Sequence, residues 1–402
     1  MAKALVLNSP LHGHVYPTLA VAQELVQRGE EVICYLTEEF EQAVVATGAT
    51  FRPYHSISCT HDVMSDRLSR FLVEECRHVI PQVVEAIQAE QPDYILYESI
   101  CLWGRLVAHR LHIPTIACRI MLAENEHFMV LPHVSPVALA LNILYRFNDL
   151  NSLNDLCTTY DLPLIEKADT YSLFLPYAED LNIVFVPRSF QPAGETFDER
   201  FVFVGPCLAD RVGASTALQE EQLASCNHPT LYISLGTLFN AQAHFFRQCI
   251  QAFGGQPWRV ILAIGQRVER TALGSIPDNI EVHAYVSQLD VLQQTLVFLT
   301  HGGTNSVMEA LFYGIPMVVI PSAVEQTVYA RQVAELGLGV VIEPKAVTVE
   351  RLQEAANMVA ADSRFRQRAQ QMQATIRAAG GTRRAVDAIL QFVSSRSLRM
   401  PA

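Results

Sequence analysis

The feature that most constrains the fold is a repeated pattern: an apolar run, an amphipathic segment and a second apolar run follow one another near the N-terminus and again from residue 230. Near the N-terminus, the apolar run KALVLNSP precedes a loop, the helical pattern VYPTLAVAQELVQRG and the apolar run EVICYL. The later copy reads TLYISLGT, AQAHFFRQCIQAFGG and WRVILAIG. Strand–helix–strand units of this kind build parallel sheets. The sequence therefore predicts an α/β protein with two doubly wound domains, and Pro17 is expected in the first turn of the first helix.

A stretch that carries several prolines and glycines, from Pro187 to Ser225, separates the two patterns. A Gly380-Gly381 break then precedes a last helical pattern, RRAVDAILQF. In doubly wound folds, ligands lie beyond the carboxyl ends of the strands, so the loops at that edge are where binding residues are expected. We expect a Rossmann-like domain over residues 1–206, a linker over 207–226, a second Rossmann-like domain over 227–381 and a C-terminal helix over 382–402.

Charge and composition exclude several classes of protein. The formal net charge is −12 and no basic run occurs, which argues against a nucleic-acid partner. Nine cysteines without a CxxC pair, after a start that lacks a signal-peptide pattern, favour a reducing, cytoplasmic location. No apolar stretch approaches the roughly 18 residues that a membrane span needs, so stable membrane insertion is not expected. The shorter apolar run PVALALNILYRF is expected to be a core or cleft helix.

One loop of the second half combines unusual residue types. Residues 300–321 read THGGTNSVMEALFYGIPMVVIP, so a His-Gly-Gly turn ends one apolar run and begins a helical pattern. Glycines let a backbone approach an anion closely, and the N–H groups of a helix start bind it. The alternative is that Ser306 and Glu309 form a capping box, which would not explain the glycines. Because no GxGxxG sequence follows a strand and opens a helix, NAD is not the expected anion.

At this point the chain resembles a known family. HGGTNSVMEAL, followed by GIPMVVIP, resembles the donor-binding signature of UDP-sugar-dependent glycosyltransferases, and the bacterial macrolide and flavonoid branch is the most similar. HGHVYPTLAVAQEL, SFQPAGETFDERFVFVGP, LYISLGT, VSQLDVL and AGGTRRAV extend the resemblance, in the family's order, over nearly the whole chain. The resemblance implies the GT-B fold, in which two Rossmann-like domains face each other across a cleft. It also implies that the sugar nucleotide binds mainly to the C-terminal domain and that the last helix packs back on the first domain.

The resemblance assigns donor-binding roles residue by residue. It implies pyrophosphate contacts from the HGGTNS segment, ribose contacts from Glu309 and uracil contacts from the YVSQ segment. It also implies sugar contacts from the Glu-Gln pair, and contacts with the phosphates or the sugar from the SLGT loop. The usual sugar-binding pair is Asp-Gln, so the glutamate of this chain leaves the hexose open. The implied donor-binding residues are Thr237, Val286, Gln288, His301, Gly303, Asn305, Ser306, Glu309, Glu325 and Gln326.

The same resemblance identifies His14 with the family's catalytic histidine. Histidine titrates near pH 6.5, which suits removal of a proton from an acceptor hydroxyl. Glu98 stands where the family has an aspartate that orients the histidine; the alternatives are that Ser99 assists or that Glu98 is a solvated strand end. His12 is nearby, but HxH without a third ligand does not predict a zinc site. The expected catalytic residues are therefore His14 and Glu98, with no metal and no cofactor besides the UDP-sugar co-substrate.

The acceptor is expected to bind to the N-terminal domain. The segments 55–80 and 119–147 carry Met and aromatic residues that would line an apolar pocket or form ordinary core, and Ser99, Met121 and Phe128 are the named candidates. The predicted function is inverting, metal-independent transfer of a hexose, glucose from UDP-glucose, to a small hydrophobic acceptor such as a flavonoid, another phenol or a macrolide. The alternatives are a UDP-sugar epimerase, a transferase with a lipid acceptor, and a non-catalytic module that binds sugar nucleotides.

Overall fold

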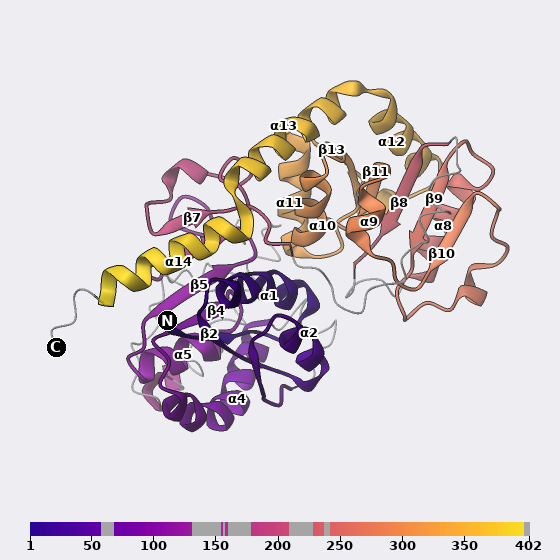
Figure 1. Ribbon diagram of the computed structural model, residues 1–402. Helices are drawn as coiled ribbons and strands as arrows, with labels where there is room; N and C mark the ends of the chain where they lie inside the picture. The colour runs from indigo at the N-terminus through magenta and orange to yellow at the C-terminus, as the bar shows by residue number, and fades with distance from the viewer. Residues whose placement is uncertain are drawn as a thin grey trace. The chain divides into compact units, whose positions relative to one another are not determined.

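The computed structural model describes residues 1–57, 68–130, 154–155, 157–159, 178–208, 228–236 and 242–397 (Figure 1). The chain divides into two compact units, one formed by residues 1–210 with 379–402 and the other by residues 211–378. The first unit therefore contains both chain ends. The expected apolar helix over 136–147 and most of the expected linker lie outside the described residues.

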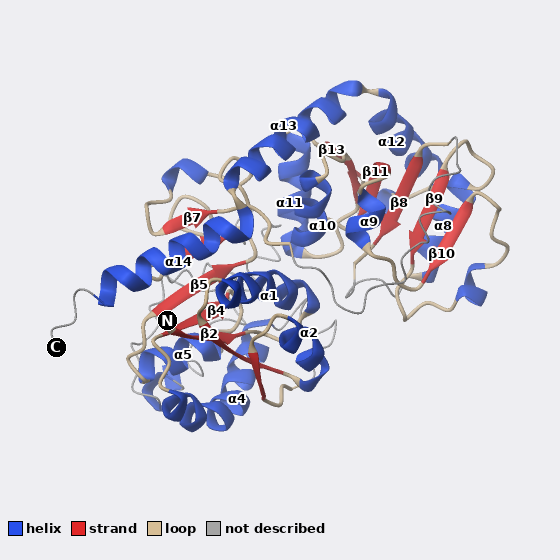
Figure 2. Ribbon diagram, viewed as in Figure 1, coloured by secondary structure: helices blue, strands red, loops and turns tan. Residues whose placement is uncertain are grey.

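The first unit is built on a parallel sheet whose strands follow the order β3-β2-β1-β4-β5-β6-β7. Its helices connect or flank these strands (Figure 2). The strands are β1 (Lys3–Leu7), β2 (Glu31–Leu36), β3 (Thr50–Pro53), β4 (Tyr94–Glu98), β5 (Thr115–Arg119), β6 (Asn182–Val184) and β7 (Phe201–Phe203). The helices are α1 (His12–Gln27), α2 (Glu41–Ala46), α4 (Leu68–Glu90), α5 (Leu102–Arg110) and α14 (Gly381–Ser397), with short 3₁₀ turns η1 (Glu38–Phe40) and η4 (Gly194–Thr196).

Strand β1 shows why the first apolar run is continuous. Leu5 and Leu7 belong to a core cluster that includes residues of α4 and α5, whereas Ala4 and Val6 belong to the cluster on the opposite face. Because helices cover both faces of a doubly wound sheet, all four residues of β1 after Lys3 are apolar and buried. The second cluster also contains residues of α1 and α14.

Helix α1 begins earlier than its proline suggests. The expectation that Pro17 lies in the first turn is wrong, since the helix begins at His12 and Pro17 is buried in its second turn. A proline at this depth removes only the hydrogen bond to the carbonyl of Gly13, and the turn before it is held by the N–H groups of His14 and Val15, which both bond to Leu11 O. The earlier start places His14 inside the first turn.

Helix α14 returns the chain to the first unit. The N–H of Gly381 donates to Val204 O at 2.8 Å, and Arg28 Nη1 of α1 lies 3.2 Å from Asp387 Oδ1. Ala385, Val386 and Ile389 are fully buried in the cluster that covers β1. The last helix is thus part of the core of the first unit.

The second unit repeats the architecture with the parallel strand order β10-β9-β8-β11-β12-β13. Its strands are β8 (Thr230–Ser234), β9 (Arg259–Ala263), β10 (Ile280–His283), β11 (Thr295–Thr300), β12 (Met317–Val319) and β13 (Gly339–Val341). Its helices are α8 (Ala243–Phe253), α9 (Gln288–Leu292), α10 (Thr304–Phe312), α11 (Val324–Glu335), α12 (Val349–Ala361) and α13 (Ser363–Ala379), with 3₁₀ turns η5 (Arg270–Leu273) and η6 (Pro344–Ala346).

The expected fold class, an α/β protein with two parallel, Rossmann-like sheets, is confirmed. None of the described helices is both long and apolar enough to cross a membrane.

Candidate active site

The first unit brings His14 and Glu98 together at the carboxyl edge of its sheet. His14 lies in the first turn of α1, which follows β1, and Glu98 is the last residue of the adjacent strand β4. His14 Nδ1 lies 2.6 Å from Glu98 Oε1. The carboxylate is fully buried, whereas 15% of the imidazole side chain is exposed. The alternative of a solvated strand end for Glu98 is therefore wrong, because this carboxylate is buried and bonded.

Two further donors fix the Glu98 carboxylate. Ser9 Oγ donates to Oε2 at 2.6 Å, and the N–H of Ile100 donates to Oε1 at 3.0 Å. An ionised carboxylate accepts only, so the bond to His14 requires a proton on Nδ1 and leaves Nε2 as the proton acceptor. Ser9, not Ser99, is the hydroxyl that assists Glu98.

The remaining histidine of the HxH sequence has a different environment. The ring of His12 is exposed and lies 4.9 Å from the ring of Phe40 and 6.0 Å from that of Tyr16, measured between centroids. The exposed ring of His12 thus lies beside Tyr16 and the buried Phe40.

The acceptor candidates occupy three environments. Ser99 Oγ donates to Cys118 O at 3.0 Å and accepts from the N–H of Ile120 at 3.1 Å, so this hydroxyl joins β4 to the segment after β5. Phe128 is buried, and Met121 is half-buried. All three lie in or beside the segment that leaves the carboxyl end of β5. Of the wider acceptor segments, residues 58–67 and 131–147 are outside the described part of the chain.

In the second unit, His301 lies at the carboxyl end of β11 and is almost fully buried. A Cβ added to Gly236 would lie 2.6 Å from His301 Cε1, and one added to Gly303 would lie 2.5 Å from Nε2. The imidazole is therefore held between two backbone segments that approach it closely because both are glycine. Burial lowers the pKa of His301 to about 4, so the ring is neutral at pH 7 and presents one N–H donor.

Helix α10 begins at Thr304, directly after this glycine turn. Gly303 is the N-cap residue and caps without a side chain, and the first helical bond runs from the N–H of Val307 to Gly303 O. The capping-box alternative for Ser306 and Glu309 is wrong, because Ser306 lies at the third helical position and Glu309 lies one turn further on. The start of α10 thus presents backbone N–H groups beside His301, as an anion site requires.

The expected base- and ribose-binding residues form a buried chain of hydrogen bonds. Tyr232 Oη donates to Gln288 Oε1 at 3.1 Å, and Gln288 Nε2 donates to Glu309 Oε2 at 2.6 Å. Val286 is buried at the turn before α9. Gln288 therefore fixes the orientation of Glu309, and Tyr232 fixes that of Gln288.

The expected sugar-binding pair lies at the start of α11. Gln326 is buried, and its Oε1 accepts from the N–H groups of Ser322 and Ala323 at 2.8 and 3.1 Å. Its Nε2 lies 3.5 Å from Glu325 Oε1, and Glu325 is half-buried. Gln326 thus caps the helix, and Glu325 is the more accessible member of the pair.

Comparison with known proteins decides the family. The family described as erythromycin biosynthesis protein CIII-like, C-terminal domain, matches residues 250–389. The chain is 35% identical to the NDP-glycosyltransferase YjiC of Bacillus licheniformis, with 98% of each chain covered. It is 31% identical to the oleandomycin glycosyltransferase of Streptomyces antibioticus, over 96% of this chain and 90% of the relative. It also resembles the crystal structure of CalG4, the calicheamicin glycosyltransferase, with a TM-score of 0.80, 32% identity and 98% of each chain covered.

The chain belongs to the NDP-glycosyltransferase family. The expected enzyme class is thereby confirmed, and the fold of this glycosyltransferase is GT-B. The expected catalytic residues His14 and Glu98 lie in the first unit and are called the base half-site below. His301 and the start of α10 lie in the second unit with the other expected donor-binding residues and are called the anion half-site, whereas Thr237 is outside the described residues.

Three residues of this glycosyltransferase were not expected from its sequence. Ser9 holds Glu98, Tyr232 holds Gln288, and Gly236 makes room for His301. Gly236 stands next to Thr237 in the SLGT loop, so a close backbone approach was a readable signal there. Nothing in the local sequence pairs Ser9 with Glu98 or Tyr232 with Gln288, which are 89 and 56 residues apart.

Proposed function

We propose that this glycosyltransferase transfers glucose from UDP-glucose to a hydroxyl of a small hydrophobic acceptor, such as a flavonoid, another phenol or a macrolide. The transfer inverts the anomeric configuration and needs no metal. The observation that carries the proposal is the 2.6 Å bond between His14 Nδ1 and the buried Glu98. The name of the relative that glycosylates oleandomycin supports a natural-product acceptor.

The base half-site supports the proton transfer. Glu98 accepts the Nδ1 proton of His14, which leaves the lone pair of Nε2 for the proton of the acceptor hydroxyl. As this proton moves to Nε2, the acceptor oxygen bonds to C1 of the sugar, and the bond between C1 and the diphosphate oxygen breaks. The negatively charged carboxylate stabilises the imidazolium that forms. Attack opposite the leaving group converts the α-linked donor into a β-linked product.

The anion half-site supports departure of the diphosphate. Negative charge grows on UDP as the bond breaks, and N–H donors that are already oriented stabilise it without reorganisation. The start of α10 and the neutral imidazole of His301 supply such donors.

The assignment of the base is tested by His14→Ala. A positioned base contributes about 10²–10⁴-fold to the rate, so kcat should fall by about that factor with UDP-glucose and a flavonoid. His12→Ala is the matched control, since the ring of His12 lies against Phe40, whereas the imidazole of His14 lies 2.6 Å from Glu98. Similar losses in both variants, or transfer by His14→Ala at the wild-type rate, would refute the base.

The substrates are tested with a panel. UDP-glucose, UDP-galactose, UDP-N-acetylglucosamine and dTDP-glucose are each combined with flavonoids and macrolides, with and without EDTA, and proton NMR gives the configuration of the product. The proposal expects the highest kcat/KM with UDP-glucose, a β-linked product and full activity in EDTA. An α-linked product or a loss of activity in EDTA would contradict the displacement described above.

A further inference from the structure

The segment that leaves β5 begins beside the base half-site. In the register of the two strands, Glu98 pairs with Cys118 of β5. Ser99, the next residue of the chain, bonds to both Cys118 O and the N–H of Ile120. Residues 120–130 therefore begin one strand away from Glu98, at the edge of the sheet where the acceptor hydroxyl must approach His14.

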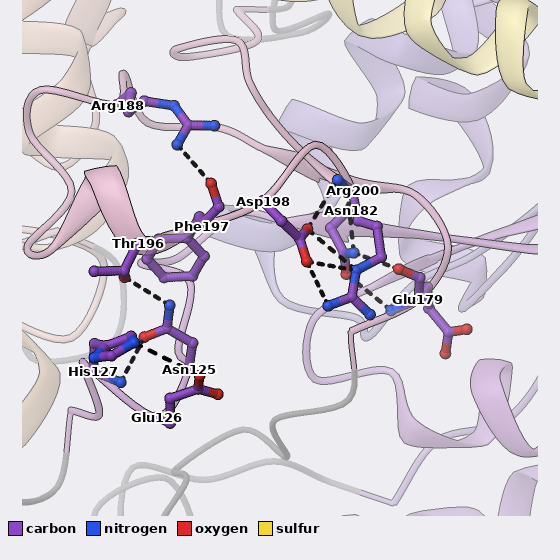
Figure 3. Close-up of polar contacts among 10 residues, drawn as sticks. All are labelled: Asn125, Glu126, His127, Glu179, Asn182, Arg188, Thr196, Phe197, Asp198 and Arg200. Carbon is purple, nitrogen blue, oxygen red and sulfur yellow. Dashed lines mark hydrogen bonds and ion pairs between the residues drawn. The ribbon is translucent and has the colours of Figure 1, made fainter.

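This segment is fixed by a side chain from a distant part of the sequence. The amide of Gln191 forms two hydrogen bonds with the backbone of Ala123: Oε1 accepts from its N–H at 2.9 Å and Nε2 donates to its carbonyl at 3.0 Å. Gln191 is 3% exposed and Ala123 is fully buried, so water does not compete for these bonds. A second link joins Asn125 Nδ2 to Thr196 Oγ1 at 2.8 Å (Figure 3).

The loop that carries Gln191 and Thr196 is itself rigid. Arg188 Nη1 donates to Gly194 O at 2.6 Å. It also donates to Phe197 O at 3.0 Å (Figure 3). The guanidinium also lies 4.4 Å from the ring centroid of Phe203. A Cβ on Gly194 would lie 2.4 Å from Arg188 O, so the turn closes only around a glycine. Arg188 also donates from Nη2 to Phe201 O at 3.2 Å. Because one planar guanidinium holds the carbonyls of Gly194, Phe197 and Phe201, these three residues cannot move independently.

We propose that Gln191 is a positioning residue that fixes residues 120–130 as a wall of the acceptor site. The inference rests on the proposed function, since it takes the acceptor to be a small hydroxylated hydrophobic molecule. Met121, which is half-buried, lies two residues before the clamped Ala123 and offers apolar surface at this edge. The segment is also closed on itself, because Glu124 Oε1 accepts from the N–H of Val130 at 2.7 Å. The clamp thus sets the position of a preformed turn and lowers the cost of ordering it when the acceptor binds.

The sharpest test is Gln191→Glu, which keeps the shape of the side chain. A carboxylate still accepts from the N–H of Ala123, but its second oxygen faces the carbonyl of Ala123 and repels it. A wall displaced in this way should raise the acceptor KM about ten-fold, since small misplacements of a binding surface have large effects on productive binding. The donor KM and the slow hydrolysis of UDP-glucose without an acceptor should stay within about two-fold of wild type, because neither depends on this wall.

Asn279→Asp is the matched control. Asn279 is also an amide clamp, although half-buried: it accepts from Gly255 N at 2.9 Å and donates to Phe253 O at 2.9 Å. It precedes β10 at the amino edge of the other sheet. It should lower thermal stability without changing the acceptor KM. Thr196→Val removes the second link conservatively and should raise the acceptor KM about three-fold, so it decides the question if Gln191→Glu does not fold.

The outcomes separate the inference from the proposed function. If wild type and both clamp variants share one acceptor KM, or if Asn279→Asp raises it equally, Gln191 has only a structural role and the inference is overturned, whereas the transferase proposal stands. If wild type transfers glucose to no acceptor of the panel, the proposed function fails and the inference fails with it.

Discussion

The environment of His301 explains the glycines of its loop. The sequence suggested that Gly302 and Gly303 let the backbone approach an anion, but side chains at Gly303 and Gly236 are excluded first by the imidazole itself. Gly303 has a φ of −64°, which any residue can adopt, so glycine is needed there only because a Cβ would collide with the imidazole of His301. Gly302, with φ of +83°, also needs the conformational freedom of glycine. The glycines therefore leave room for the imidazole of His301, which lies beside the start of α10.

The buried state of His301 makes stability depend on pH. Its pKa is about 4 in the fold and about 6.5 in the unfolded chain, so the unfolded state binds more protons between these values. The stability present above pH 6.5 is therefore lost as the pH falls toward 4. Urea titrations of wild type and His301→Asn from pH 7.5 to 4.5 should show a difference in free energy of unfolding that shrinks by about 2–3 kcal/mol over this range. A difference that is constant with pH would show that the imidazole is not held neutral.

At the same scale, the sequence predicted some partners and not others. His14, Glu98 and His301 were predicted from motifs, because strand ends and helix starts are readable in a sequence. Ser9 was missed since a hydroxyl beside a proline has no periodicity that points to a carboxylate on another strand. Gln326 was expected to contact sugar, yet its Oε1 caps α11. A motif identifies a residue type, whereas its hydrogen-bond partners depend on tertiary packing.

Among elements, the alternation of apolar and amphipathic segments predicted both sheets. The start of α10 at Thr304 was predicted, whereas α1 starts at His12, earlier than its proline suggested. A proline in the sequence indicates where a helix can begin. The residue at which the helix does begin depends on the geometry of the preceding loop.

Glu179 joins several elements of the first unit. Its carboxylate accepts from Tyr97 of β4 and Thr115 of β5, both at 2.8 Å, and from Arg105 of α5 at 2.9 Å. Burial alone would raise the pKa of Glu179, but His109, whose Nε2 lies 3.6 Å away, together with Arg105, Thr115 and Tyr97 outweighs it and lowers the pKa to about 2. Asn182 bonds to the backbone of the same residue (Figure 3). One carboxylate thus joins β4, β5 and α5.

We therefore expect Glu179→Gln to lower the free energy of unfolding at pH 7 by about 3 kcal/mol, as loss of a buried ionic partner does. Because the folded pKa lies below the ordinary value of 4.5, the advantage of wild type should fade as the pH falls from 4.5 toward 2. Denaturant titrations at several pH values measure this. Glu126→Gln is the control, since that side chain is 86% exposed, and equal effects of the two variants would contradict the role of Glu179.

For the whole molecule, the main structural fact is that the chain passes from the first unit to the second and returns. The return segment is not an appendage, because three residues of α14 are fully buried against the core that also contains Leu19 and Val21 of α1. The resemblance implied this packing, but the hydrophobic pattern RRAVDAILQF alone predicted only a helix. Which surface a terminal helix covers is decided by a partner far away in the sequence.

Ile389→Ser tests this packing in the full-length chain. It leaves a cavity and buries a hydroxyl, so we expect a loss of about 3–5 kcal/mol and a lower thermal midpoint for the first unit. Differential scanning calorimetry and limited proteolysis should both report it, with Gln391→Ser, on the exposed side of the same helix, as the control. Equal midpoints for wild type and Ile389→Ser would mean that α14 does not complete this core.

The return of α14 also has a consequence for biosynthesis. On a ribosome, the second unit is contiguous and can assemble as soon as its own residues have emerged. The first unit, although translated earlier, must wait for the final helix with part of its β1 face uncovered. Premature termination near residue 380 would therefore impair folding of the first unit, which is translated first, and not that of the second unit.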